Sequence, residues 1–308
     1  MKKILVLGSE GLVGSALRNQ LGDTHVYHKR SEIDLTDRAK TLDYITHQVK
    51  RNGVDTIINC AAKVGGVQAN MKNNKGFFLD NFILNNNVIE SAFVNEIPNF
   101  VNLLSTCIFP DKEVTYPLTP DQIDNGAPHF TNYGYSYAKR LAGYEMKIVK
   151  NVLQSNWVSV IPTNVYGMHD NFHLEDGHMV PAMIHRAYLA KKNKEKMLVW
   201  GDGSPLRQLI YSEDLARLIL WSMDNWKSDD AFMAINPEEV TILETAKTIC
   251  KSVGVSSKEL IFDDTKPRGQ FRKPAITNAP EDFEFTSLKD GINQTVRWFE
   301  ENYPNIRK

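Results

Sequence analysis

Tyr135 and Lys139 are four residues apart in the stretch NYGYSYAKRLAGYEMKIV, so a helix places both side chains on one face. A lysine ammonium beside a tyrosine lowers the pKa of the phenol from about 10, so that it can exchange a proton at neutral pH. Tyr133 and Tyr137 have no lysine at this spacing. Ser105 ends a predicted buried strand, at the sheet edge where ligands bind. Ser105, Tyr135 and Lys139 therefore predict a site of proton transfer.

Cys107 and His178 are two further candidates for chemistry. Cys107 follows Ser105 by two positions, and His178 lies in the polar stretch MHDNFHLEDGHMVP. Taken singly, a free cysteine is more often a small buried apolar residue, and an isolated histidine is more often a loop or cap residue. Taken together, they suit the epimerisation of a 4-keto sugar. Inverting a carbon beside the carbonyl needs a base on one face of the ring and a proton donor on the other.

Three glycines near the start of the chain, Gly8, Gly11 and Gly14, have the spacing GxxGxxG. They follow an apolar run at 3–7 and open a helix predicted over 12–21, which is the context that makes such a motif informative. Glycine permits the tight turn and the close approach of a diphosphate, and the helix N-terminus supplies free N–H groups. The motif predicts a dinucleotide site; the alternative is a glycine-rich turn that binds nothing.

The residues after the second predicted strand indicate which dinucleotide is bound. An acidic side chain there selects NAD, and a cation selects the 2′-phosphate of NADP. Lys29 and Arg30 occupy this place, and the planar guanidinium of Arg30 suits a phosphate, so we predict NADPH/NADP as the cofactor. Asp34 could instead contact the adenine. The alternative for the two cations is an ordinary solvated surface.

Buried strands alternate with helices through the first part of the chain, which predicts an α/β fold with a doubly wound parallel sheet of the Rossmann type. After Gly167 the regularity breaks, and we expect a smaller α/β substrate-binding lobe. The predicted strands are 3–7, 25–28, 54–62, 100–105, 157–167, two short strands about the GDGSP turn at 201–205, 231–235 and 259–262. The predicted helices are 12–21, 38–51, 82–95, 179–192, 212–226, 241–252 opened by Thr241-x-x-Glu244, and one opened by Ser287-x-x-Asp290.

The two lobes are expected to exchange segments of chain. We place the cofactor-binding domain at 1–166 with 208–238, and the substrate-binding domain at 167–207 with 239–308. The sequence contains no internal repeat, low-complexity tract or Gly/Ser linker that would separate them.

The composition limits the possible partners. The chain has 308 residues and a formal net charge of -1, so it has no overall field that attracts nucleic acid or an anionic membrane. The three cysteines, Cys60, Cys107 and Cys250, are far apart and predict neither a disulfide framework nor a CxxC metal site. The first apolar run is too short for a signal sequence or a membrane span. We expect a cytoplasmic protein without metal, nucleic acid or membrane association.

Several stretches resemble the GDP-L-fucose synthases, a family of extended short-chain dehydrogenase/reductases that epimerise and reduce GDP-4-keto-6-deoxymannose. These stretches run nearly from end to end and are GSEGLVGSAL, AAKVGGVQAN, LLSTCIFP, NYGYSYAKR, IPTNVYG, HDNFHLEDGHMVPAMIHR, VWGDGSPLRQLIYSEDLA and GQFRKPA. The resemblance implies that Ser105, Tyr135 and Lys139 form the reductase triad, and that Cys107 and His178 epimerise the flanking carbons. It also implies a homodimer with two-fold symmetry, formed by the helix that carries Tyr135.

The resemblance further implies where substrate and cofactor are held. Arg186 and Arg207 would hold the GDP diphosphate, Trp200 would line the nucleotide site, and Lys273 would lie near the substrate. The other implied cofactor contacts are Lys139, Pro162, Asn164, Val165 and His178.

Two positions depart from the family pattern. Glu10 stands in the glycine turn where some members have an arginine for the 2′-phosphate, which leaves that role to Arg30. Arg268 replaces an acidic residue, so contacts at the nucleotide end are expected to differ.

Three other functions remain open. A sugar-nucleotide 4-epimerase or 4,6-dehydratase would recycle bound NAD, although such dehydratases usually have Thr-Asp-Glu where this chain has Ser105, Thr106 and Cys107. A 5-epimerase-4-reductase would act on a 3-deoxy sugar. A non-catalytic dinucleotide sensor would not need the triad.

Overall fold

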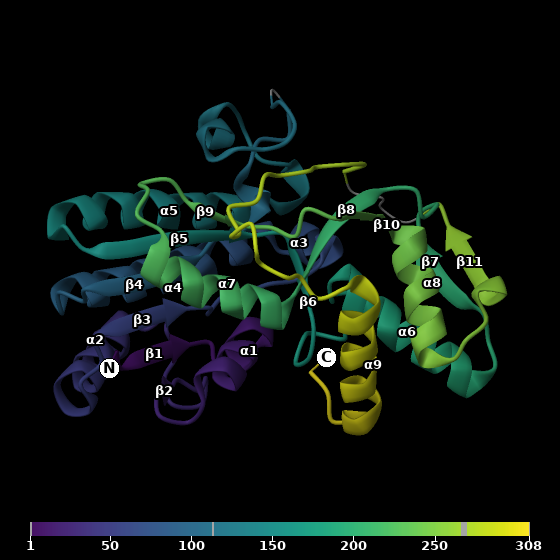
Figure 1. The fold of residues 1–308 in the computed structure, drawn as a ribbon, viewed down its shortest axis with the longest axis horizontal. Helices are drawn as coiled ribbons and strands as arrows, with labels where there is room; N and C mark the ends of the chain where they lie inside the picture. Colours follow the sequence, from purple (N-terminus) through teal and green to yellow (C-terminus); the bar gives the residue numbers. More distant parts are fainter. Residues whose placement is uncertain (1, 113, 266–269, 308) are drawn as a thin grey trace.

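The computed structural model describes residues 2–112, 114–265 and 270–307, which form two lobes of α/β structure (Figure 1). The larger lobe is built on a six-stranded parallel sheet with the spatial order β2-β1-β3-β4-β5-β9. Its strands are β1 (Ile4–Leu7), β2 (Val26–Tyr27), β3 (Thr56–Asn59), β4 (Asn99–Leu103), β5 (Asn156–Pro162) and β9 (Phe232–Ala234). This order grows outward from β1 in both directions, so the predicted doubly wound fold is confirmed.

Helices cover both faces of this sheet because its strands are apolar on both sides. One face carries α2 (Arg38–Asn52), α4 (Asn74–Val94) and α5 (Tyr133–Leu153), and the other carries α1 (Leu12–Leu21) and α7 (Ser212–Asn225). Strand β1 shows the division clearly. Leu5 and Leu7 pack into the core on the first face, and Ile4 and Val6 pack into the core on the second.

Helix α4 begins at Asn74, well before the predicted start near residue 82. Asn81, in the first half of this helix, is buried where an amphipathic helix would present an apolar residue. This buried polar residue interrupts the apolar spacing, so the sequence pattern revealed only the later part of the helix. Asn73 caps the helix by accepting a hydrogen bond from the backbone N–H of Gly76 at 3.0 Å.

The smaller lobe packs three helices against two small sheets. Its helices are α6 (Met179–Asn193), α8 (Ile242–Val253) and α9 (Leu288–Asn302), and its strands are β6 (Asn164–Tyr166), β7 (Met197–Trp200), β8 (Leu206–Tyr211), β10 (Glu239–Thr241) and β11 (Leu260–Asp263). The three-stranded sheet has the order β10-β8-β6, and β11 pairs with β7 in parallel. Thr241 and Ser287 cap α8 and α9, and the predicted capping box of α8 is present.

The strands predicted about the GDGSP turn form as β7 and β8, but they do not pair with each other. β7 pairs with β11, whereas β8 pairs with β6 and β10. Gly201 and Gly203 have φ angles of 77° and 79°, and these left-handed residues direct the chain from one sheet into the other. The single strand predicted at 157–167 is likewise two strands, because the chain leaves the central sheet at Thr163.

Residues 270–276, which we call the connecting segment, are bonded to both lobes. On one side, the backbone N–H of Leu206 at the start of β8 donates to the carbonyl of Phe271 at 3.0 Å. On the other side, the backbone N–H of Leu118 donates to the carbonyl of Pro274 at 2.8 Å. This segment therefore fixes the position of β8 relative to the loop that follows β4.

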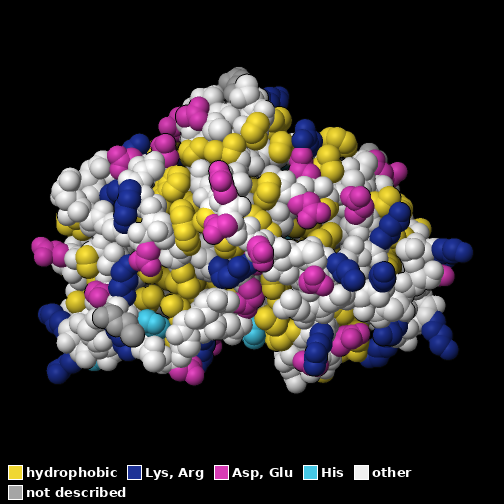
Figure 2. Space-filling view, viewed as in Figure 1, with side chains coloured by type: hydrophobic (Ala, Val, Ile, Leu, Met, Phe, Trp, Pro, Cys, Tyr) yellow, Lys and Arg dark blue, Asp and Glu magenta, His cyan; other side chains and the backbone are white. Residues whose placement is uncertain are grey.

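Nucleic acid, a membrane and a metal ion would need, in turn, a basic surface, a long apolar helix and a cluster of metal-binding side chains. Lys and Arg side chains are interspersed with Asp and Glu over the face shown in Figure 2, so this face has no extended basic surface. None of the helices in the described ranges is long and apolar enough to cross a membrane. Within the same ranges, no group of three or more His, Cys, Asp and Glu side chains is arranged to hold a metal ion.

Candidate active site

The carboxyl ends of β4 and β5 form the edge at which the predicted reductase residues lie. Ser105 follows β4 and is the N-cap of η1 (Thr106–Ile108), a short 3-10 helix that contains Cys107. The hydroxyl oxygen of Ser105 accepts a hydrogen bond from the backbone N–H of Cys107 at 3.2 Å. This cap explains why Ser105 and Cys107 emerge together at one edge of the sheet.

Helix α5 brings Tyr135 and Lys139 to the same edge. The Tyr135 side chain is hydrogen-bonded to that of Ser105, and it interacts electrostatically with the thiol of Cys107. Lys139 is 1% exposed, and its Nζ donates to the carbonyl of Leu103 at 2.7 Å. The structure thus brings Ser105, Cys107, Tyr135 and Lys139 together from two separate elements.

The pKa directions at this site differ from the expectation. Burial raises the pKa of Tyr135 above its ordinary value of 10, and the hydrogen bond with Ser105 offsets this only in part. Burial lowers the pKa of Lys139 to about 8, and the nearby Cys60 acts in the opposite direction. The direction for Tyr135 is therefore opposite to the expected lowering, because burial is the largest cause. Tyr135 is therefore protonated at neutral pH and suited to donate a proton.

We predict that Lys139→Met removes a pH-dependent contribution to the free energy of unfolding. Below pH 8 the buried ammonium is charged in the folded and unfolded states, and folding carries the cost of its burial. Between pH 8 and 10.5 the folded state is neutral while the unfolded chain still binds the proton, so the wild type gains stability as pH rises. From pH 7 to 9.5, the free energy of unfolding of the wild type minus that of the variant should rise by about 2 kcal/mol.

Chemical denaturation at several pH values measures this difference. Lys147→Met is the matched control, because Lys147 is exposed on the same helix. The free-energy difference for the control should not vary with pH. A difference for Lys139→Met that is equally flat would contradict the assignment of a buried, charged ammonium.

The turn between β1 and α1 fits the diphosphate of a dinucleotide. Gly8 has a φ of 74°, and a Cβ on Gly14 would lie 2.3 Å from the carbonyl oxygen of Gly8, so neither position accepts a side chain without strain. Gly11 is the N-cap of α1 and provides no capping side chain. The first N–H groups of α1 are therefore free of side-chain caps and can bind an anion.

The loop after β2 lies beside this turn. The backbone N–H of Arg30 donates to the carboxylate of Glu10 at 3.1 Å, and Arg30 is exposed. Asp34 accepts hydrogen bonds from the backbone N–H of Thr36 at 2.9 Å and from its hydroxyl at 2.8 Å. These bonds hold the pKa of Asp34 below its ordinary value. Glu10 thus connects the glycine turn with the loop that carries Arg30.

Pro162, Asn164 and Val165 lie where the chain leaves β5 for β6. Strands β4 and β5 are adjacent, and the backbone N–H of Leu104 donates to the carbonyl of Val160 at 2.8 Å. The side chain of Asn164 donates to the carbonyl of Gln208 at 3.1 Å. The crossover is therefore fixed at the same edge of the sheet as Ser105.

His178 is the N-cap residue of α6 and is partly exposed. Its Nδ1 lies 3.9 Å from Oδ1 of Asp170, a buried carboxylate whose Oδ2 has no hydrogen-bond partner among the described residues. The backbone two residues before His178 accepts a hydrogen bond from the N–H of Gly66 in the larger lobe at 2.8 Å. No hydrogen bond or ion pair in the described part of the chain joins His178 to Cys107, so their joint action remains a prediction.

Two of the predicted substrate residues are in direct contact. The guanidinium of Arg186 lies over the ring of Trp200, 4.4 Å from its centroid. Arg186 also donates a hydrogen bond to the carbonyl of Leu174. Burial lowers the pKa of Arg186 from its ordinary value without removing its charge. A planar cation stacked on an aromatic ring suits a nucleotide diphosphate.

The other two predicted substrate residues lie at the connecting segment. Arg207 donates to the carbonyl of Phe271 at 3.4 Å, and burial lowers its pKa. Lys273 lies 3.4 Å from the carbonyl of Phe109 and interacts electrostatically with Cys107. The segment therefore brings Lys273 to the end of η1, whereas Arg268 lies outside the described residues.

The sequence interpretation missed a set of buried asparagines behind the cofactor turn. Asn59 donates to the side chain of Asn102 at 2.9 Å. Asn81 accepts from the backbone N–H of Lys63 and donates to its carbonyl, both at 3.0 Å. These bonds hold the loop after β3, whose backbone packs against Gly8. In the sequence, these residues could have been recognised as asparagines that interrupt otherwise apolar runs.

A model of the NAD dependent epimerase/dehydratase family matches residues 4–236. A GDP-L-fucose synthase from Dictyostelium discoideum is 38% identical over 319 residues, which cover 100% of this chain and 98% of that protein. A probable GDP-L-fucose synthase from Drosophila melanogaster is 37% identical over 327 residues, with 100% of both chains covered. The chain belongs to the GDP-L-fucose synthase family.

A solved structure extends this result to three dimensions. The GDP-L-fucose synthetase from Naegleria fowleri bound to NADP is 34% identical and has a TM-score of 0.89, covering 100% of this chain and 95% of that one. Membership of the GDP-L-fucose synthase family confirms the resemblance seen in the sequence motifs.

Proposed function

We propose that this protein converts GDP-4-keto-6-deoxy-D-mannose to GDP-L-fucose by epimerisation at C3 and C5 and reduction at C4 with NADPH. The observation that carries the proposal is the hydrogen bond between Tyr135 and Ser105 beside the thiol of Cys107. A hydroxyl suited to donate the proton for reduction and a thiol suited to epimerisation lie together there, which supports the proposal. The family relationship supports the choice of substrate.

The GDP-sugar binds between the two lobes. Their proposed bounds are 1–166 with 208–238 for the cofactor domain and 167–207 with 239–308 for the substrate domain, and the sheet of β6, β8 and β10 spans this boundary. Arg186 and Arg207 hold its diphosphate and Trp200 lines the nucleotide site. Lys273 lies at the sugar, because its ammonium interacts electrostatically with Cys107. The cations supply locally the positive charge that the chain as a whole lacks.

Epimerisation uses acid and base groups of the chain. The thiolate of Cys107 removes a proton from the carbon beside the C4 carbonyl, and the electron pair moves onto the carbonyl oxygen to give an enolate. Tyr135 and Ser105 donate hydrogen bonds to that oxygen. His178 returns a proton from the opposite face, and its Nδ1 lies 3.9 Å from Oδ1 of the buried Asp170. Cys107 then loses its proton to solvent and His178 regains one from solvent, and the same steps at the other flanking carbon invert the second centre.

Reduction uses the same oxygen-binding groups. NADPH supplies a hydride to C4 when it is bound. Tyr135 donates its proton to the C4 oxygen as negative charge develops there, and its raised pKa ensures that the proton is present at neutral pH. Ser105 orients the Tyr135 hydroxyl. Lys139 holds the backbone of β4 in place and contributes a positive charge at the nicotinamide end of the site.

The residues of the larger lobe fit NADPH. Gly8, Gly11 and Gly14 leave room for the diphosphate, and the exposed guanidinium of Arg30 can pair with the 2′-phosphate. The carboxylate of Glu10 beside the Arg30 backbone reduces the local positive field. The preference for NADPH over NADH is therefore smaller than Arg30 alone would give. Asp34 meets the adenine side, and Pro162, Asn164, Val165 and His178 line the nicotinamide side.

A product assay by NMR with GDP-4-keto-6-deoxymannose and NADPH tests the proposal, because it reports reduction and both inversions together. The expected product is GDP-L-fucose, with one NADPH oxidised for each sugar converted. Turnover without net oxidation of NADPH would instead indicate a recycling epimerase or dehydratase. Inversion at C5 alone would indicate a 5-epimerase-4-reductase, and tight NADPH binding with no turnover would indicate a sensor.

We also propose that the chain forms a two-fold symmetric homodimer in the cytoplasm. Helices α4 and α5 pack side by side and leave a row of large apolar side chains exposed on their outer faces. These are Leu79, Phe82, Ile83, Phe93 and Val94 on α4, and Tyr133, Tyr137, Leu141, Tyr144, Ile148 and Val152 on α5. Such a surface suits a second copy of the chain. The free thiols of Cys60, Cys107 and Cys250 suit a reducing compartment.

We predict that Ile148→Glu converts the dimer to a monomer. Ile148 is 63% exposed on α5, so the change does not disturb the core of one subunit but places a charge in the proposed apolar interface. Sedimentation velocity at micromolar concentration measures the assembly. Ile261→Glu, on the exposed strand β11 of the smaller lobe, is the matched control and should leave the dimer intact. A wild-type protein that sediments as a monomer would refute the dimer.

A further inference from the structure

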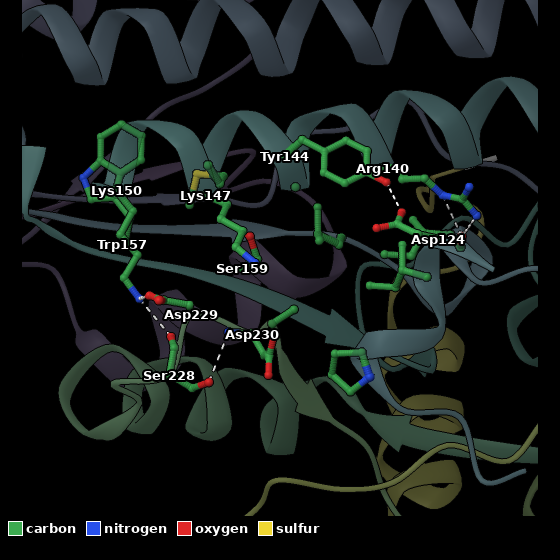
Figure 3. Close-up of a pocket in the computed structure, with 17 residues that line it drawn as sticks. Asp124, Arg140, Tyr144, Lys147, Lys150, Trp157, Ser159, Ser228, Asp229 and Asp230 are labelled. Carbon is green, nitrogen blue, oxygen red and sulfur yellow. Dashed lines mark hydrogen bonds and ion pairs between the residues drawn. The ribbon is translucent and has the colours of Figure 1, made fainter. Parts of the chain in front are cut away.

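Arg140, the residue after Lys139, is buried beside η1 and bonds to backbone carbonyls. It is 8% exposed, its Nε donates to the carbonyl of Ile108 at 3.1 Å, and its Nη2 donates to the same oxygen. Its Nη1 donates to the carbonyl of Gly126 at 3.0 Å. Ile108 is the last residue of the turn that contains Cys107. Figure 3 shows the guanidinium of Arg140 pointing away from α5 toward the loop that carries Asp124.

The environment of Arg140 shows that these carbonyl bonds are its main polar contacts. Within the described residues, Arg140 forms no ion pair, and its guanidinium lies 5.5 Å from the ring centroid of Tyr137. A buried guanidinium is stable only when its donors are used, so the carbonyls of Ile108 and Gly126 are held firmly in return. The neighbouring cavity of about 120 Å³ is bounded by Arg140, but it contains none of the predicted catalytic side chains.

Consecutive residues of α5 therefore hold the chain on both sides of the candidate catalytic residues. Lys139 bonds to the carbonyl of Leu103, before Ser105, and Arg140 bonds to the carbonyl of Ile108, directly after Cys107. Tyr135, on the same helix, bonds to Ser105 between these two points. The helix that carries the proton donor thus also sets the position of the thiol.

We propose that Arg140 is a positioning residue that fixes the turn carrying Cys107, so that the thiol meets the ring carbons while Tyr135 meets the carbonyl oxygen. This proposal rests on the proposed function. Arg140 acts through η1 and does not touch the substrate. A fork of donors on two carbonyls fixes both the position and the orientation of the turn, which a single ammonium cannot do.

Two variants of Arg140 and one control test the proposal. Arg140→Met keeps the length of the side chain and removes all its donors, and Arg140→Lys keeps the charge but loses the planar fork. Lys150→Met is the matched control, because Lys150 on the same helix also donates to a loop carbonyl, that of Ser228 at 2.8 Å, far from Cys107. For each protein, the rate of deuterium entry into the sugar ring of GDP-4-keto-6-deoxymannose gives kcat and KM for epimerisation.

Amide hydrogen exchange measured by mass spectrometry gives a second readout that needs no substrate. The backbone N–H groups of Cys107, Ile108 and Phe109 donate to the nearby Ser105 and Thr106. If Arg140 holds the turn, these amides exchange faster in Arg140→Met and at the wild-type rate in Lys150→Met.

We expect Arg140→Met to lower kcat for ring exchange about 100-fold with KM unchanged, because a misplacement of about 1 Å has this effect. Arg140→Lys should restore part of that loss, and Lys150→Met should match the wild type. Unchanged amide exchange at residues 107–109, or faster amide exchange with unchanged kcat, overturns the proposal. The proposal is also overturned if a fall in thermal stability accounts for the whole loss of kcat in both Arg140 variants. If the wild type exchanges no ring protons, the proposed function fails, and the amide exchange alone decides whether Arg140 holds the turn.

Discussion

Tyr135→Phe is expected to lower kcat for NADPH oxidation by about 1000-fold, within the usual range for loss of a general acid. The change removes only the hydroxyl that bonds to Ser105 and leaves the ring in place. Deuterium entry into the sugar ring should also slow, because the same hydroxyl stabilises the enolate oxygen. Affinity for NADPH should stay close to that of the wild type, since Lys139 and the glycine turn are unaltered.

Steady-state oxidation of NADPH, ring exchange followed by NMR and a fluorescence titration with NADPH measure these three effects. Tyr137→Phe is the matched control, because Tyr137 is exposed two residues further along the helix and keeps its ring beside Arg140. The control should retain wild-type rates. Retention of more than a small fraction of reductase activity by Tyr135→Phe would remove this residue from the role of proton donor.

Cys107→Ser is expected to affect inversion far more than reduction. A serine hydroxyl does not ionise near neutral pH, so the base is lost and deuterium entry into the ring should fall by about 1000-fold. Serine keeps the backbone bond to Ser105 and fits the turn, so NADPH binding should be unchanged. Tyr135 remains able to protonate the C4 oxygen, and we expect slow reduction to a sugar with C3 and C5 uninverted.

The products and the ring exchange can be followed in the same NMR experiment in deuterated water. Cys250→Ala is the control, because Cys250 is buried in the core of the smaller lobe, away from the candidate site. It should lose some stability and keep the wild-type rate of exchange. Undiminished exchange in Cys107→Ser would show that another group is the base.

The local motifs of the catalytic residues could be read from the sequence because each depends on short spacing. The GxxGxxG turn and the Tyr135–Lys139 pair lie within single turns or helices, and Ser105 and Cys107 flank the end of one buried strand. Their common location follows from the rule that the carboxyl ends of parallel strands share one edge. The family resemblance added the substrate, which no spacing in the chain identifies.

The pKa direction of Tyr135, the start of α4 and the role of Arg140 depend on contacts between distant segments, which the spacing of residues in the sequence does not reveal. The pKa of Tyr135 is raised rather than lowered, because burial in the folded chain is the largest cause. The start of α4 was missed because Asn81 is buried and bonds to Lys63 in the loop after β3, whereas the spacing of apolar residues alone assigns an asparagine to the polar surface. Arg140 gave no signal either, since its partners are backbone carbonyls remote in the sequence.

The connecting segment limits how far the two lobes can move apart. Phe271 is bonded to Leu206 in β8, and Pro274 is bonded to Leu118 in the loop after β4. A hinge motion that swung the lobes widely apart would break these backbone bonds, each worth about 1 kcal/mol. These bonds link the two lobes to one short stretch of chain, so we expect a ligand that contacts both lobes to bind without a large domain closure.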